Sequence, residues 1–84
     1  MIRAYVLINV EPNQEYEVVK KLEKIKSVKN ADIVFGEFDI IATVEAEDMP
    51  SLSKTLKEIR TKTKGVKKTS TMITAESYKK MLVG

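Results

Sequence analysis

The order in which the hydrophobic period changes along the chain constrains its fold more than any other feature. Apolar and polar side chains alternate with a period of two in some segments and recur at helical spacing in others, which distinguishes strands from helices. Strands are predicted over residues 2–10, 28–35, 40–46 and 66–75. A helical segment lies between the first two strands and another between the last two. The order strand, helix, strand, strand, helix, strand fills one small domain.

The two predicted helices have recognisable ends. The first is expected to begin at an N-cap, Asn13, and to end near Lys26 or Ser27. The second is expected to begin at the N-cap Asp48 and to end before Gly65, a residue suited to the end of a helix. The apolar stripes consist of Val18, Leu22 and Ile25 in the first helix and of Met49, Leu52, Leu56 and Ile59 in the second.

These elements predict one α+β fold. Right-handed crossovers through both helices place the helices on the same face of a four-stranded antiparallel sheet. This is the ferredoxin-like βαββαβ arrangement. The other face of the sheet is left open, and a second copy is expected to pack on it. The candidates for this open face are Tyr5, Leu7, Ile41, Thr69 and Thr71.

The composition excludes several classes of function. The chain has no cysteine and no histidine, which excludes thiolate chemistry, Cys/His metal sites and histidine acid–base catalysis. No metal or other cofactor is predicted. The net charge of +3 is spread over lysines interleaved with glutamates, so no basic stripe for direct nucleic-acid binding is predicted. No apolar run approaches the roughly 20 residues that span a bilayer, so a cytoplasmic protein without membrane contact is expected.

The turn Gly36-Glu37-Phe38-Asp39 carries the groups best suited to bind a small molecule. Gly36 allows close backbone approach, and N–H groups around such a turn can receive a carboxylate. Asp39 can accept hydrogen bonds from an ammonium group. The hydroxyls of Thr69 and Thr71 would add polar contacts if the last strand lies nearby. Together these groups suit an α-amino acid, although Gly36 and Asp39 also suit a purely structural turn, and the threonines suit a strand.

Two runs of sequence resemble the ligand-binding domain of Lrp/AsnC transcription regulators. The first runs from Ala31 to Val44 around the Gly-x-x-Asp hairpin, and the second from Lys64 to Ile73 has the pattern Gly-Val-x-x-Thr-x-Thr. The resemblance covers about residues 2–76. It implies a single effector-binding domain at 1–76 with a C-terminal tail at 77–84. Full-length members carry a helix-turn-helix domain that this sequence does not match, so it resembles the stand-alone version.

The resemblance also implies a function and an assembly. It implies an ACT-like domain that forms a homodimer, a dimeric α/β barrel, through the open sheet face, and further an octamer or decamer. An amino acid effector is expected near the hairpin. A full-length Lrp-like regulator is an expected partner. The residues expected to bind the ligand are Gly36, Glu37, Phe38, Asp39, Thr69 and Thr71.

Other functions fit the residues less well. A ligand-free assembly module remains open as the alternative. Glu37 and Asp39 lie in an exposed turn, and Glu11-Pro12-Asn13 is not the phosphate-cradling loop of an acylphosphatase, so no enzyme and no catalytic residue is predicted. An RNA-binding sheet would need more exposed aromatic residues than Tyr5.

Overall fold

Four strands and two helices follow one another in the predicted order. The structure, a computed structural model, describes residues 1–78; the predicted C-terminal tail, 77–84, lies outside the described residues from position 79 on. The elements are β1 (Ile2–Val10), α1 (Glu15–Glu23), β2 (Val28–Ile33), β3 (Ile40–Ala46), α2 (Met49–Lys62) and β4 (Val66–Ile73). Within the described part, no helix is both long and apolar enough to cross a membrane.

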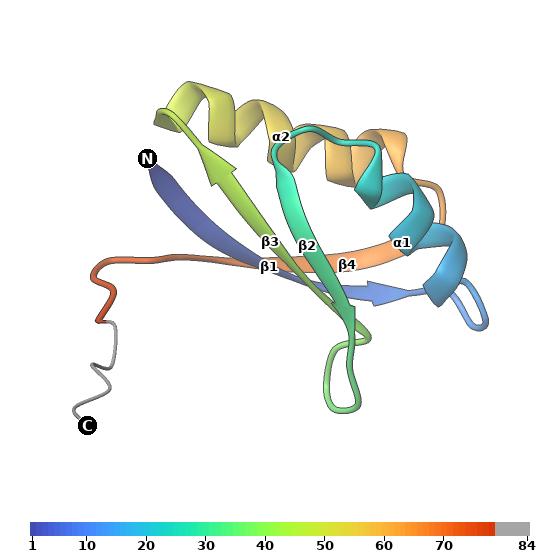
Figure 1. Cartoon of the computed structure of the whole chain (residues 1–84). Helices are drawn as coiled ribbons and strands as arrows, with labels where there is room; N and C mark the ends of the chain where they lie inside the picture. Colours follow the sequence, from blue (N-terminus) through green and yellow to red (C-terminus); the bar gives the residue numbers. More distant parts are fainter. Residues whose placement is uncertain (79–84) are drawn as a thin grey trace.

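The strands form one antiparallel sheet in the order β2-β3-β1-β4. Both helices cover the same face of this sheet, and within residues 1–78 no helix or strand covers the other face (Figure 1). The ferredoxin-like βαββαβ prediction is therefore confirmed. β1 is a central strand, and β2 and β4 form the two edges.

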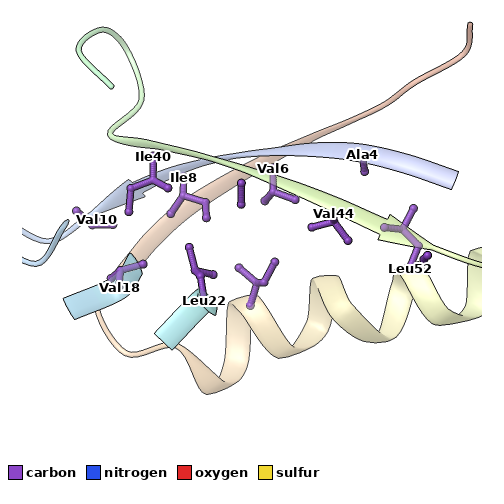
Figure 2. Close-up of a cluster of buried hydrophobic side chains, with 12 residues drawn as sticks. Ala4, Val6, Ile8, Val10, Val18, Leu22, Ile40, Val44 and Leu52 are labelled. Atoms are coloured by element: carbon purple, nitrogen blue, oxygen red, sulfur yellow. The ribbon is translucent and has the colours of Figure 1, made fainter. Parts of the chain in front are cut away.

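Strict alternation along β1 and β3 builds the core. Every second residue of β1 from Ala4 to Val10 is buried, and so is every second residue of β3 from Ile40 to Ala46. Figure 2 shows these side chains pointing at Val18 and Leu22 of α1 and Leu52 of α2. This burial defines the helix-covered face of the sheet.

The ends of α1 differ from the prediction. Asn13 is not the N-cap, because it takes a positive φ of 65° in the turn before the helix. Gln14 occupies the cap position and makes no side-chain capping bond. The helix ends at Glu23 because the N–H groups of Lys24 and Ile25 bond carbonyls three residues back, which tightens the last turn. Ile25 still packs on the core from this turn.

α2 begins as predicted. The Oδ1 atom of Asp48 accepts a hydrogen bond from the Ser51 N–H at 2.9 Å. Hydrogen bonding by Ser51, through its side chain first and its N–H second, lowers the pKa of Asp48. The apolar stripe of α2 differs from the prediction at its first position. Met49 is half exposed, and Thr55 is buried together with Leu52 and Ile59. The Thr55 hydroxyl donates to the Ser51 carbonyl at 3.2 Å. That internal bond lets a polar side chain occupy the core.

β2 and β4 each end two residues earlier than predicted. β2 stops at Ile33, so the connection to β3 is a six-residue loop, Val34–Asp39, rather than a tight turn. Phe35 was expected on the strand but lies in this loop, fully exposed. β4 stops at Ile73 rather than at Ala75.

The open face was predicted correctly for β1 and β3 and wrongly for β4. Tyr5 and Leu7 lie on it, and Ile41 is the direct partner of Leu7. Thr71 and Thr69 pair with the buried Val6 and Ile8, so they lie on the helix-covered face. The reason is a β-bulge.

The bulge reverses the alternation of β4. Val66 pairs with Val10, but the next residue back along β1, Asn9, pairs with Lys68, which leaves Lys67 as the extra residue. An extra residue shifts every later side chain to the opposite face. Lys68, Ser70 and Met72 therefore share the open face with β1 residues Asn9, Leu7 and Tyr5.

Candidate ligand-binding site

The candidate site is the hairpin loop Val34–Asp39 and the sheet surface next to it. Figure 1 shows the loop projecting from the end of the sheet, away from the two helices. Its base is closed by a hydrogen bond from the Val34 N–H to the Asp39 carbonyl at 2.9 Å. The loop therefore has a defined conformation at its neck, and its tip, residues 35–38, is free of the sheet ladder.

Asp39 fastens the loop to β1. Its N–H donates to the Ile8 carbonyl at 2.9 Å, and its Oδ2 atom accepts from the Val10 N–H at 2.9 Å. The ladder between β1 and β3 ends at the pair Ile8–Ile40, so the Val10 N–H has no partner on β3. The Asp39 carboxylate supplies that partner. The Oδ2 atom is thus occupied by the hydrogen bond that holds the loop on β1, and the Oδ1 atom remains able to accept from another donor.

Asn9 is a site residue that the sequence analysis missed. Its Nδ2 atom donates to the Glu37 carbonyl at 2.8 Å, and its side chain lies on the open face. This bond holds the loop tip over the open face. The signal in the sequence was an asparagine at an open-face position near the end of a strand, where an apolar residue would otherwise continue the alternation.

A shallow hollow of about 520 Å³ lies between the loop and the open face. Its walls are mostly apolar, and its residues are Leu7, Val34, Phe35, Gly36, Glu37, Phe38 and Ile41. No basic side chain lines it among the described residues. Three of the predicted ligand-binding residues, Gly36, Glu37 and Phe38, therefore share one concave surface, and Asp39 lies at the base of the loop, outside the lining.

The loop tip offers backbone donors. Within residues 1–78, the N–H groups of residues 35–38 have no hydrogen-bond acceptor in the protein. Gly36 has a φ of 151°, which L side chains rarely adopt, and no atom lies within 4 Å of where its Cβ would be. The tip can therefore meet a ligand or a second chain with its backbone.

The threonines of β4 lie away from this site. β1 separates β4 from β3 in the sheet, and Thr69 and Thr71 lie on its helix-covered face. The structure brings together the four hairpin residues of the predicted set and does not bring the two threonines to them.

Arg3 and Glu45 form an ion pair on the open face, at the end of the sheet opposite to the hairpin loop. The Nη2 atom of Arg3 lies 3.2 Å from Glu45 Oε2. The Tyr5 hydroxyl and the Glu45 carboxylate raise the pKa of the Arg3 guanidinium. Arg3 lies at the opposite end of β1 from Ile8, where the hairpin is attached, so its charge is already matched and remote from the hollow.

Comparison with known proteins identifies the family. The model of the Lrp/AsnC ligand binding domain matches residues 3–83. An uncharacterized HTH-type transcriptional regulator of Pyrococcus furiosus is 34% identical over 79 residues, which make up 90% of this chain and 53% of that protein. The chain spans about half the length of the curated relatives that it matches.

Solved structures show the same fold. A hypothetical protein from Pyrococcus horikoshii has a TM-score of 0.83 and 33% identity, and the match covers 93% of this chain and 94% of that one. A transcriptional regulator of Neisseria meningitidis, solved as an L-Met complex, has a TM-score of 0.81 at 16% identity, covering 94% of this chain and 53% of that one. The matched family consists of ligand-binding domains of transcription regulators and not of enzymes. The resemblance seen in the sequence is confirmed, and the chain belongs to the Lrp/AsnC ligand-binding-domain family.

Proposed function

We propose that the hairpin loop binds an amino acid and that the chain is an oligomerising regulatory module. The observation that carries the proposal is the row of four unpaired amides, residues 35–38, at the edge of an apolar hollow. The family of the chain is defined by ligand binding, which supports the same use of this surface.

Each part of an amino acid has a complementary group in the loop. The amides around Gly36 would receive the ligand carboxylate. The free Oδ1 atom of Asp39 and the carboxylate of Glu37 would accept from the ammonium group. The walls formed by Leu7 and Ile41, with the aromatic rings of the loop, favour an apolar side chain. The L-Met complex of the Neisseria regulator, which has the same fold, supports this ligand class.

The open face is the proposed route from ligand to response. Tyr5, Leu7 and Ile41 give it an apolar centre that a second copy would cover, forming a homodimer and from it an octamer or decamer. The hollow adjoins this face, so a ligand would favour one assembly state over another. We propose a full-length regulator of the same family as a partner, joined through the same face in the cytoplasm. The HTH-type relatives, about twice as long, support this choice.

The test is the response of assembly to amino acids. We would measure mass by light scattering, and the melting temperature, with and without each of the twenty amino acids. A response to one or a few apolar amino acids is expected. Asp39→Asn should abolish it while keeping an acceptor for the Val10 N–H. Glu17→Gln removes an equal charge from the exposed surface of α1 and should leave the response intact.

A second function, ligand-free assembly, is favoured by one observation. Asp39 and Asn9 already serve the loop's own structure through Val10 and Glu37. An oligomer that responds to none of the amino acids would support this function and contradict the first one. A stable monomer would contradict both.

A further inference from the structure

A second concave surface lies on the other side of the sheet, between α2 and β4. It has a volume of about 270 Å³. Its floor consists of Val6, Leu56 and Ile59, of which Val6 and Ile59 are fully buried core residues. Its rim consists of Ser53, Arg60, Thr69 and Thr71. We call this surface the α2–β4 groove. It contains the two β4 threonines that the hairpin site does not use.

The hydroxyls of the groove differ from those of Thr55 and Thr61 in α2. Thr55 and Thr61 donate to carbonyls one turn back in their own helix, at 3.2 Å and 2.7 Å. Within residues 1–78, the hydroxyls of Ser53, Thr69 and Thr71 have no hydrogen-bond partner in the protein. Three hydroxyls from two elements therefore border one groove with their donors unused.

The charge that lines the groove is positive and comes from Arg60. Arg60 supplies a guanidinium group, and no carboxylate is part of the lining. Arg60 forms no ion pair with any residue of the described part of the chain, whereas Arg3 is paired with Glu45. A guanidinium presents several N–H donors in a planar fork that matches the two oxygens of a carboxylate or phosphate.

The edge of β4 adds backbone donors beside the groove. The Thr74 N–H donates to the Arg3 carbonyl, so the N–H groups of Thr74 and, back to the bulge, of every second residue before it on β4 point toward β1. Alternation along a strand then directs the N–H groups of Thr69 and Thr71 away from β1. That side of β4 is a free edge of the sheet.

We propose that the α2–β4 groove is a second binding site, for a small molecule that carries a carboxylate or phosphate group. Arg60 and the hydroxyls of Ser53, Thr69 and Thr71 bind the oxyanion. The apolar part of the molecule rests on Leu56, with Val6 and Ile59 below it. The site lies on the helix-covered face and the hairpin hollow on the open face, so the two sites share no lining residue.

The experiment uses the uniformly ¹⁵N-labelled chain and two probes, inorganic phosphate and acetate. Amide chemical shifts are followed while each probe is added at constant ionic strength, with chloride as the balancing anion. Saturating shifts are expected at Ser53, Arg60, Thr69 and Thr71 with at least one probe, whether or not acetate also shifts residues 35–38, whose amides can receive a carboxylate. The probe with the lower Kd identifies which oxyanion the groove prefers.

Variants separate a built site from general attraction to a basic surface. Arg60→Gln should weaken binding about tenfold or more, because it removes charge-assisted hydrogen bonds. Thr71→Val keeps the shape and should weaken binding about threefold to tenfold, because it removes one hydroxyl. Lys57→Gln, on an exposed lysine of α2 outside the lining, should change Kd less than about twofold, because exposed charges are screened.

Three outcomes would overturn the proposal. The first is shifts that fail to saturate with either probe. The second is an effect of Lys57→Gln equal to that of Arg60→Gln. The third is a Thr71→Val variant that binds as the parent does. Since Thr71 is exposed, its variant is expected to fold even if Arg60→Gln does not. If the hairpin proves not to bind amino acids, the phosphate and acetate Kd values at the groove remain a valid test, so failure of one proposal is distinguishable from failure of the other.

Discussion

At the scale of single residues, Asp39 replaces a missing strand partner. Its carboxylate accepts the Val10 N–H at a point where β1 extends beyond β3. Asp39→Ala should lower the free energy of unfolding by about 1–3 kcal/mol, because it leaves a part-buried N–H unsatisfied. Asp39→Asn retains an acceptor oxygen and should lose less than half as much. Urea denaturation of the three proteins measures both differences.

Equal losses for the two Asp39 variants would contradict this role. They would mean that the charge of Asp39, and not its acceptor geometry, stabilises the loop. Asn9→Ala is the companion variant, because Asn9 bonds the Glu37 carbonyl from the same end of β1.

At the scale of elements, Gly36 and Gly65, the glycines with positive φ among residues 1–78, test how the loops are packed. Gly65 has a φ of 104°, and an added Cβ would lie 3.1 Å from Val18 Cγ2. Gly65→Ala should cost about 1–3 kcal/mol, because backbone strain and crowding against α1 add together. Gly36→Ala meets no atom within 4 Å and should cost less, through backbone strain alone. Thermal denaturation ranks the two, and a larger loss at Gly36 would contradict the open loop tip.

The N-cap of α2 makes part of the stability depend on pH. The hydrogen bond from Ser51 lowers the pKa of Asp48 below its usual value of 3.8. A lowered folded-state pKa stabilises the protein above the unfolded pKa, and this stabilisation is lost as the pH falls through the folded pKa. Asp48→Asn caps the helix without a titrating charge.

The melting temperature of the parent chain should therefore exceed that of Asp48→Asn at neutral pH. The difference should shrink below a pH of about 4, where the carboxylate takes up its proton. Melting curves of both proteins from neutral to acidic pH check this expectation. A difference that stays constant with pH would show that the charge of Asp48 contributes nothing to the cap.

At the scale of the whole molecule, no helix or strand of the described residues covers the open face of the sheet. Leu7→Lys places a charge at the centre of that face, beside Ile41, without touching the core. The expected result is a fall in mass to that of the monomer, with an unchanged circular dichroism spectrum. Glu17→Lys, on the exposed surface of α1, is the control and should keep the parent mass. Light scattering distinguishes the outcomes, and an unchanged mass for Leu7→Lys would contradict assembly through this face.

The sequence was sufficient to predict the elements whose pattern is local. β1 and β3 have the predicted bounds, because a sheet with one buried face imposes strict alternation on its central strands. The cap at Asp48 was equally predictable, because it depends on a bond three residues away. The four hairpin residues were proposed as ligand-binding residues from their types and spacing, and that they share one loop was predictable because they are consecutive in the sequence.

The features that the sequence did not predict depend on contacts between distant segments. The bulge at Lys67 arises from the pairing of β4 with β1, and it moves Thr69 and Thr71 to the opposite face. Asn9 gains its role from a loop that lies 28 residues further along the chain. Single-residue patterns contain no information about such pairings, so the threonines were assigned to the wrong face.

The position of β1 in the sheet has a consequence for the synthesis of the protein. β1 is the first strand of this domain to be synthesised, yet both of its neighbours, β3 and β4, are made later. Until Ile40–Ala46 emerges, the most apolar strand of the core has nothing to pair with, and its second edge stays bare until Val66–Ile73 follows. The growing domain therefore carries an exposed apolar segment until its last strand has been made, and its sheet is complete only then.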